Sequence, residues 1–304
     1  MCTLDAPGGA GQYHFDYRRY FRLAKVRRET PGESVKIGRQ EQRSSAISTS
    51  NAETIIVRGR DLVRELVGAI SFTEHFWLLV TGALPSPAQR RVLDATLVAI
   101  AEHGLVPSVQ AARMTFAAAP EALQGAVASG ILGCGSVVLG SAEAAGRLFE
   151  EIHTRAVDGT TLESAATAVV REYRAARRAI PGYGHPLHSG GDPRAGRLLE
   201  LAAESGVAGH YIEIARLIER LMPALLNRPL TLNVSGAIPA VLLDAGYPLL
   251  GLKGVPLLAR TAGLIAHLVE EQQRAIGFVM SHAAAQAIDY DGEAPAGFEP
   301  GEEG

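Results

Sequence analysis

Helix start signals recur along this chain and constrain its fold more than any other feature. Residues 71–74 read Ser-Phe-Thr-Glu, a capping box in which the serine and the glutamate satisfy backbone amides at the start of a helix. Ser86-Pro87 and Asp192-Pro193 each place a capping residue before a proline that suits the first helical turn. A chain with these signals is expected to be built mainly from helices.

The spacing of apolar residues and the positions of glycine and proline predict where the helices run. One face of residues 62–70 carries Leu62, Val63, Leu66, Val67 and Ile70. Further helices are expected at 72–80, 86–103, 160–178, 192–205, 209–227 and 254–276. Only residues 54–58, Thr-Ile-Ile-Val-Arg, have the composition of a strand. The predicted fold class is therefore all-α.

Composition and charge exclude several classes of protein. Apolar residues make up 47% and charged residues 20% of the chain, so it is too apolar to be disordered. A net charge of −3 argues against a protein built to hold nucleic acid. Charged residues and prolines interrupt the apolar stretch 236–269, so no membrane span is expected. Only Cys2 and Cys134 occur and no signal peptide is visible, which predicts a cytoplasmic protein.

The two ends of the chain differ from the region between them. Residues 1–45 are rich in Lys and Arg and are expected to form a basic arm. This arm is either a solvated flanking segment or a phosphate-binding edge. Residues 293–304 are acidic and contain Gly and Pro, as a frayed tail does.

Two short motifs are weak matches to ligand sites. Gly133-Cys-Gly135 resembles the start of a dinucleotide fingerprint, but no strand precedes it, and close helix packing explains the glycines better. His185 and His188, with Asp192 nearby, lack a third ligand at a spacing typical of a metal site. No metal is therefore predicted.

One glycine-rich segment, residues 181–194, has the chemistry of an anion site. Its glycines let the backbone approach a ligand and offer amide groups to it. His185 can donate to a developing oxyanion, and Arg194 suits a bidentate grip on a carboxylate. The helix dipole disfavours an arginine in the first turn of a helix, which favours a ligand role for Arg194. From the residues alone, an anion site and a plain interhelical loop are equally favoured.

This segment resembles the Gly-x-Gly-His…Asp-Pro-Arg signature of the citrate synthase superfamily. Other blocks that resemble the family follow in the expected order, at 71–85, 101–104 with Arg113, 232–236, 258–263 with His267, and 288–292. The resemblance covers about residues 46–292. The short chain and residues 58–61, Arg-Gly-Arg-Asp, place it nearer to stand-alone citryl-CoA lyases than to full-length synthases.

The resemblance implies a citrate synthase-like fold of two helical domains. Residues 46–139 and 244–292 would form the large domain, and residues 140–243 the small domain. The active-site cleft would lie between them, and closure of the domains would exclude water. The family also implies a homodimer or a dimer of dimers.

The resemblance further assigns roles to single residues. His103 matches the histidine that contacts the oxo-acid or citryl part of the substrate, and His185 matches the one that binds the reacting carbonyl or hydroxyl. Arg194 and Arg260 match arginines that hold substrate carboxylates. The backbone that reads the adenine of coenzyme A is matched by Gly182, Tyr183, Gly184, Pro186 and Leu187. The implied ligands are an acyl-CoA thioester and a carboxylate or oxo-acid partner.

Some positions depart from the family pattern. Ser235 stands where the family has its catalytic aspartate, and a serine hydroxyl has no useful pKa near neutrality unless another group activates it. Leu139 stands where synthases have a histidine, which the citryl-CoA lyase module of ATP-citrate lyase also lacks. Ser189 stands where synthases have an arginine for a CoA phosphate, and basic residues of 18–43 are a candidate replacement.

Two kinds of function remain open. The first is a carbon–carbon lyase, or a Claisen-type condensing enzyme, that acts on an acyl-CoA with a carboxylate arm. In it Ser235 would be a third catalytic residue beside His103 and His185. The second is a catalytically degenerate protein that binds CoA esters or di- and tricarboxylates, either as a sensor or as a partner subunit.

Overall fold

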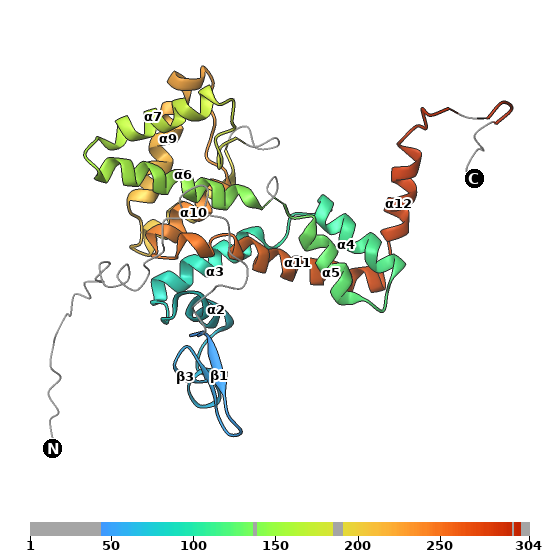
Figure 1. Cartoon of the computed structure of the whole chain (residues 1–304), viewed down its shortest axis with the longest axis horizontal. Helices are drawn as coiled ribbons and strands as arrows, with labels where there is room; N and C mark the ends of the chain where they lie inside the picture. The colour runs from blue at the N-terminus through green and yellow to red at the C-terminus, as the bar shows by residue number, and fades with distance from the viewer. Residues whose placement is uncertain (1–43, 136–138, 185–190, 294, 299–304) are drawn as a thin grey trace. The chain divides into compact units, whose positions relative to one another are not determined.

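The structure is a computed structural model that describes residues 44–298, except 136–138, 185–190 and 294. Residues 1–46 separate from residues 47–304 as a unit of their own, and the helices and strands of the described chain lie in the second unit. The fold is mostly helical, with one small sheet near the start of this unit (Figure 1).

The sheet has three short antiparallel strands, β1 (Ser48–Ser50), β2 (Ile55–Val57) and β3 (Arg60–Asp61). Ser48 lies opposite Val57 in its register. The strand expected at 54–58 is confirmed as β2, whereas β1 and β3 were not expected. These strands lack the apolar alternation by which a strand is recognised in a sequence.

The helix expected over residues 62–70 is wrong in length. Only η1 (Leu62–Leu66), a single π-helical turn capped by Asp61, is formed. The chain leaves it at Gly68, whose φ of +79° is readily adopted only by glycine. Val63 and Val67 are consequently exposed, and of this turn only Leu66 is buried.

Helices α2 (Phe72–Thr81) and α3 (Pro87–Ala101) form where their capping signals predict them. Helices α4 (Pro107–Ala118) and α5 (Leu123–Leu132) follow without a side-chain cap and were not expected from the sequence. Ser71 and Ser86 each form a complete capping box, the second with Gln89. Gly82 ends α2 in the left-handed conformation.

Seven further helices and one short 3₁₀ turn follow in the described part of the chain. The helices are α6 (Gly140–Val157), α7 (Leu162–Ala175), α8 (Pro193–Glu204), α9 (His210–Leu226), α10 (Val234–Asp244), α11 (Gly254–Gln273) and α12 (Gly277–Gln286). The turn is η2 (Leu249–Gly251). Thr161, not Thr160, caps α7, and this helix ends at Ala175, three residues before the expected Arg178. Helix α11 likewise ends three residues before the expected residue 276.

Helix α10 is the centre of the main core. Its residues from Ala237 to Leu243 are all buried, and it packs against α6, α8 and α9 (Figure 1). A second cluster of buried residues joins α4 and α5 to α11, which also packs against α3. The core therefore holds the start of α10 in place from several sides.

By length and composition alone, Leu249–Gln273 could cross a membrane, contrary to the expectation for this stretch. The contacts of α11 with α3, α4 and α5 account for much of its apolar character. Its side chains Arg260 and Glu271 are also buried among these contacts. A helix at the core of a folded domain has the same composition.

Close helix packing occurs at Gly133 of the motif Gly133-Cys-Gly135 and is tighter at Gly130 beside it. A Cβ on Gly130 would lie 2.8 Å from Leu264 and from the carbonyl of Ser108, and one on Gly133 would lie 3.5 Å from Cα of Ser108. Nothing lies within 4 Å of such an atom on Gly135. Gly130 thus lets α5 approach α4 and α11, and the packing expected of the motif is found at Gly133 but not at Gly135.

Candidate active site

The start of α10 carries Ser235 in a half-buried position. Asn233 caps this helix, because its Oδ1 accepts from the Gly236 amide at 3.2 Å. Within the described residues, the hydroxyl of Ser235 has no hydrogen-bond partner. It is therefore able to donate to a ligand or a water molecule and to accept from it.

The glycine-rich segment lies directly against this helix start. The carbonyl of Gly182 accepts from the amide of Asn233 at 3.0 Å, and the amide of Gly184 donates to the carbonyl of Thr231 at 2.8 Å. Between these bonds, Tyr183 and Leu232 form an antiparallel bridge. The predicted cofactor loop and the predicted catalytic serine thus meet at one place.

Two glycines make this approach possible. Gly182 has a φ of +87°, and a Cβ on it would lie 2.7 Å from Cα of Gly236. Likewise, a Cβ on Gly236 would lie 2.5 Å from the carbonyl oxygen of Gly182. Because real Cβ atoms do not approach so closely, neither position accepts a side chain without movement of the backbone.

Tyr183 belongs to the core rather than to the surface of the loop. Its hydroxyl donates to the carbonyl of Ala215 at 2.7 Å. Burial, together with the charge of Glu219, raises the pKa of the Tyr183 phenol well above its ordinary value. The side chain therefore anchors the loop, and only the backbone of Tyr183 is available for the cofactor role expected of it.

Asp192 and Arg194 form a charged pair next to Ser235. Asp192 caps α8 and accepts from Arg194 through both carboxylate oxygens, at 3.0 Å from Nε and 2.9 Å from Nη2. It also accepts from the amide of Val234 at 2.9 Å. Burial opposes ionisation of Asp192, but the hydrogen bonds from Arg194 and Val234 outweigh burial and lower its pKa.

This pair limits how Arg194 can serve as a carboxylate ligand. Asp192 already occupies the Nε edge of its guanidinium, while Nη1 has no hydrogen bond among the described residues. Arg194 remains about one quarter exposed, so Nη1 is open to a second carboxylate. Asp192, which the sequence indicated as a helix cap and as a weak candidate for a metal site, is the residue that orients this arginine.

Arg260 is buried without a partner. It lies in α11 and is 4% exposed, yet its Nε and Nη1 atoms make no hydrogen bond in the described chain. A buried charge without an ion pair is costly, and proteins rarely keep one without a purpose. An anion that enters this site would satisfy the guanidinium.

His103 lies on the segment that reaches Arg260. Gly263, one turn after Arg260 on α11, is pressed so closely against the carbonyl of Ala101 that a Cβ would collide with it. His103 follows two residues later and is exposed. The structure therefore brings the segment of His103 to within one helical turn of Arg260.

Next to His103, charged side chains of residue 102, α4 and α11 form a network. Glu102 Oε2 lies 3.0 Å from Nε2 of His267, and burial of Glu102 is outweighed by this contact and the Gly104 amide, which lower its pKa. Further along, the buried Arg113 donates from Nε to Glu271 at 2.5 Å. Burial disfavours the charge of Arg113, but its carboxylate partners outweigh burial and raise its pKa.

The candidate residues thus fall into two groups. Gly182, Gly184, Arg194 and Ser235 lie together at the start of α10, and His103 and Arg260 lie where α3 meets α11. Among the described residues, no hydrogen bond or ion pair joins Ser235 or Arg194 to Arg260. His185, Pro186 and Leu187 lie outside the described residues, as do His188 and Ser189. Leu139 is buried at the start of α6.

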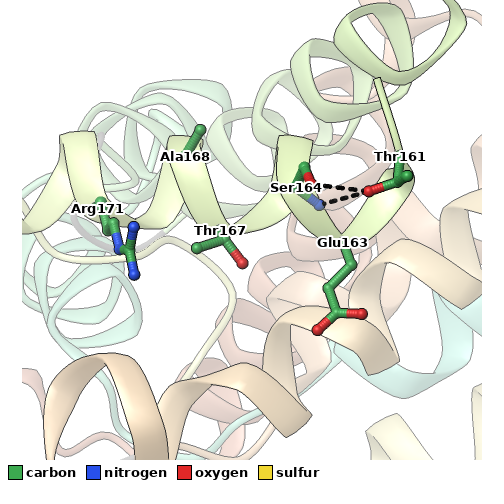
Figure 2. Close-up of a pocket in the computed structure, with 6 residues that line it drawn as sticks. All are labelled: Thr161, Glu163, Ser164, Thr167, Ala168 and Arg171. Atoms are coloured by element: carbon green, nitrogen blue, oxygen red, sulfur yellow. Dashed lines mark hydrogen bonds between the residues drawn. The ribbon is translucent and has the colours of Figure 1, made fainter. Parts of the chain in front are cut away.

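Two of the hollows on the described surface bear on the site. One, of about 330 Å³, follows a single face of α7. Figure 2 shows Thr161 bonded to Ser164 at one end of it and Arg171 at the other, beyond Thr167 and Ala168. None of the candidate residues lines it. A second, of about 420 Å³, borders Tyr183 and Gly184 and includes several arginines. In the described part of the chain, no group of three or more His, Cys, Asp or Glu could hold a metal.

Comparison with known families decides what kind of protein this is. The model of the citrate synthase C-terminal domain matches residues 85–277, more than half of the chain. The chain belongs to the citrate synthase family. The resemblance seen in the sequence is confirmed at the level of the family, as is the mostly helical citrate synthase-like fold.

Individual members of the citrate synthase family give the same result. The chain is 30% identical over 210 residues to the citrate/2-methylcitrate synthase of Bacillus subtilis, which covers 66% of this chain and 53% of that protein. It therefore spans about half the length of this relative. The structure of citryl-CoA lyase from Hydrogenobacter thermophilus matches with a TM-score of 0.74 and 30% identity, over 84% of this chain and 97% of that one.

A more distant structure shares the fold. ATP citrate lyase from Methanosaeta concilii, solved as a complex with (3S)-citryl-CoA, matches with a TM-score of 0.68 and 22% identity, over all of this chain and 47% of that one. The division of the present citrate synthase-like chain at residues 140 and 243 stays a prediction, as do the roles of its site residues.

Proposed function

We propose that this protein is a carbon–carbon lyase of the citryl-CoA lyase type, which cleaves a hydroxyacyl-CoA thioester that bears carboxylate groups. The reverse reaction, a Claisen-type condensation, uses the same groups. The likeness to the Hydrogenobacter citryl-CoA lyase supports this proposal, because it extends over nearly the whole of that chain. The observation that carries it is Arg260, a buried guanidinium whose Nε and Nη1 receive no hydrogen bond from the described residues, and which an anionic ligand would satisfy.

The proposed cleavage involves three sets of residues: two histidines, two arginines and Ser235. His185, which the resemblance places at the reacting hydroxyl, would accept its proton, while the adjacent carbon–carbon bond breaks and its electron pair passes to the thioester fragment as an enolate. His103 and His185 would stabilise the oxygen that becomes a carbonyl. Arg194 and Arg260 would hold the carboxylates, since arginine grips a carboxylate in a fixed geometry.

The enolate must then gain a proton on carbon. Ser235 lies at the start of α10, where its hydroxyl has no hydrogen-bond partner among the described residues and where the resemblance implies that other family members have an aspartate. A hydroxyl is too weak an acid for this role near neutral pH. We propose that Ser235 instead positions a water molecule that delivers the proton and is restored by the proton that left the substrate hydroxyl, so that cleavage is slower than with a carboxylic acid.

The same serine favours one alternative. If no acid replaces the aspartate, the site keeps its anion-binding arginines and loses its chemistry. The protein would then bind a CoA ester or a di- or tricarboxylate as a sensor, or act as a partner subunit. The Asp192–Arg194 pair and Arg260, which has no partner among the described residues, support a working ligand site under both functions.

A homodimer fits the surface of the last two helices. Ile265 and Val269 lie one turn apart on α11 and are each about half exposed, and Phe278 and Val279 of α12 are about two thirds exposed. Exposed apolar patches of this kind mark association surfaces. We propose that a second copy of the chain covers them, and Val269→Glu is expected to shift the protein to a monomer in light scattering.

Cleavage of citryl-CoA, followed by separation of the products, tests the proposed function. Wild-type protein and the Ser235→Asp variant are compared, with Arg171→Gln as a control on the outer face of α7. Cleavage by the wild type supports the lyase. Cleavage by Ser235→Asp alone supports the degenerate binding protein. Cleavage by neither, together with no binding of coenzyme A or citrate, contradicts both functions.

A further inference from the structure

The turn that carries His103 is closed by the carboxylate of its neighbour, Glu102. Helix α3 ends at Ala101, and Glu102 follows with an extended backbone. Oε1 of Glu102 accepts from the amide of Gly104 at 2.5 Å, and the backbone of His103 also forms a hydrogen bond with this carboxylate. A single side chain therefore fixes the backbone on both sides of the His103 side chain.

The same carboxylate is held from α11. Nε2 of His267 lies 3.0 Å from Oε2 of Glu102, although the two atoms are not aligned as a hydrogen bond. A Cβ on Gly263 would lie 3.2 Å from this Oε2, so the carboxylate lies directly against the helix. Gly263 and His267 are one turn apart, on the face of α11 that also carries Arg260. Glu102 thus connects the turn of His103 to the helix of Arg260.

Arg113 decides which nitrogen of His267 faces Glu102. Nη1 of Arg113 lies 3.4 Å from Nδ1 of His267. Because a guanidinium has only donors, Nδ1 must accept, and a neutral His267 then carries its proton on Nε2, toward Glu102. Arg113 is 2% exposed and is paired with Glu271. The contact with Glu102 is therefore fixed by buried charges and not by a mobile surface side chain.

Stability alone does not account for this arrangement. The side chain of Glu102 is about half exposed, and a charge pair with an exposed partner contributes little to folding. The close contact of Gly263 with the carbonyl of Ala101 already joins the end of α3 to α11. The carboxylate of Glu102 adds a fixed direction to the residue that follows it, His103.

We propose that Glu102 and His267 position His103, so that its imidazole faces the anion that Arg260 holds. Both are positioning residues, because they act on the substrate only through His103. The role of His103 toward substrate rests on the proposed function, whereas the contacts that fix its turn do not. A misplacement of about 1 Å in a reacting group can slow catalysis about 100-fold, so such a contact has a measurable effect.

Amide hydrogen exchange tests the turn without any ligand. The amide of Gly104 is expected to exchange about tenfold faster in Glu102→Ala and in His267→Ala than in the wild type. Glu270→Gln is a matched control, because Glu270 also pairs with Arg113 from α11 but lies outside the turn. This control is expected to leave the exchange rate unchanged. The proposal is overturned if His267→Ala also leaves it unchanged.

Citrate binding, measured by calorimetry, tests whether Glu102 acts through His103. Glu102→Ala and His103→Ala are each expected to bind citrate about tenfold more weakly than the wild type. The double variant Glu102→Ala/His103→Ala is expected to bind no more weakly than His103→Ala alone, because Glu102 has no effect once the imidazole is gone. Losses that add in the double variant would contradict the positioning role.

A conservative variant of His267 separates positioning from packing. His267→Gln keeps an N–H group that can reach Glu102 and an oxygen that can accept from Arg113. It is expected to bind citrate nearly as tightly as the wild type, while His267→Ala binds about tenfold more weakly. Equal losses in these two variants would show that the polar contact with Glu102 does not matter.

Kinetics separate this proposal from the proposed lyase function. If both are right, Glu102→Ala is expected to lower kcat about 10- to 100-fold and to leave the affinity for coenzyme A alone unchanged, because the glycine-rich loop lies elsewhere. If the wild type neither cleaves citryl-CoA nor binds citrate, the lyase function fails, and the exchange rate of Gly104 still decides whether His267 fixes the turn. If the wild type cleaves citryl-CoA and Glu102→Ala keeps its kcat and citrate affinity, only the positioning proposal fails.

Discussion

Asp192 holds Arg194 through both of its carboxylate oxygens while it also caps α8 and accepts from the first amide of α10. One buried carboxylate therefore connects two helix starts and one candidate substrate ligand. Asp192 both positions Arg194 and stabilises the fold, and an experiment can separate these two effects.

Asp192→Asn is expected to destabilise the protein by about 2–3 kcal/mol, because the amide cannot replace the charged bonds to Arg194. Urea unfolding measures this loss. If Arg194 is only structural, citrate affinity will be unchanged in the folded variant. If the pair orients Arg194 toward substrate, the affinity falls. An unfolding free energy equal to that of the wild type would contradict the role given to Asp192.

The same residue predicts a dependence on pH. The pKa of Asp192 is lower in the folded than in the unfolded chain, so its contribution is fully present above the ordinary aspartate pKa of about 4. The contribution is lost as the pH falls through the lowered value. The difference in unfolding free energy between wild type and Asp192→Asn is expected to shrink from pH 5 toward pH 2. If this difference in unfolding free energy grows as the pH falls, the pKa of Asp192 is not lowered by folding.

Gly236→Ala is expected to cost about 1–3 kcal/mol, because its Cβ would overlap the carbonyl of Gly182. Gly196→Ala is a matched control, since nothing lies within 4 Å of a Cβ there and the residue is exposed inside α8. The Gly196→Ala control is expected to be more stable than the wild type by up to about 1 kcal/mol, because alanine has a higher helix propensity than glycine. Thermal unfolding of both variants tests this difference. Equal changes in melting temperature would argue against the close contact between Gly236 and Gly182.

Arg260→Met is expected to raise the stability of the free protein by roughly 1–3 kcal/mol, because it removes a buried charge that has no partner in the described chain. Citrate is expected to raise the melting temperature of the wild type and to leave that of the variant unchanged. A variant that is less stable than the wild type without ligand would show that Arg260 has a structural partner.

Glu271→Ala is expected to lower the stability of the protein by about 3–5 kcal/mol, because the buried guanidinium of Arg113 loses its ion pair with Glu271. Glu271 also accepts from the amides of Ile276 and Gly277 at 2.9 and 2.7 Å, which joins α11 to the start of α12. Limited proteolysis is therefore expected to cut the variant near residues 274–277 first. The double variant Arg113→Met/Glu271→Leu is expected to recover part of the stability, and no recovery would argue against a charge effect.

The sequence predicted the features that depend on near neighbours. The capping boxes at Ser71 and Ser86 and the helix start at Asp192 are local patterns, and the structure confirms them. The short strands β1 and β3 and the brief turn at 62–66 were not predicted. Their conformations depend on pairing with β2 and on the left-handed Gly68, which apolar spacing does not report.

The candidate site was predictable as a set of residues but not as an arrangement. The motif at 181–194 pointed to Gly182 and Arg194, and the block at 232–236 pointed to Ser235. Their contact depends on backbone bonds between distant segments, which no local pattern encodes. The arginines that line the hollow beside Gly184 were missed for the same reason. Their sequence signal is the run of arginines at 174–178, and Arg228 joins that run through the packing of α7 against α9.

The contact between the glycine-rich loop and α10 also bears on how the protein folds. Asn233 donates from Nδ2 to the carbonyl of Gly184 at 2.6 Å, although the two residues are 49 positions apart. The intervening chain includes α8 and α9, so the bond between Asn233 and Gly184 closes a long stretch of chain. Contacts between such distant segments form late, because a long loop must be closed first. A partly folded chain therefore has no binding site, and a ligand that binds there selects only molecules that have completed their core.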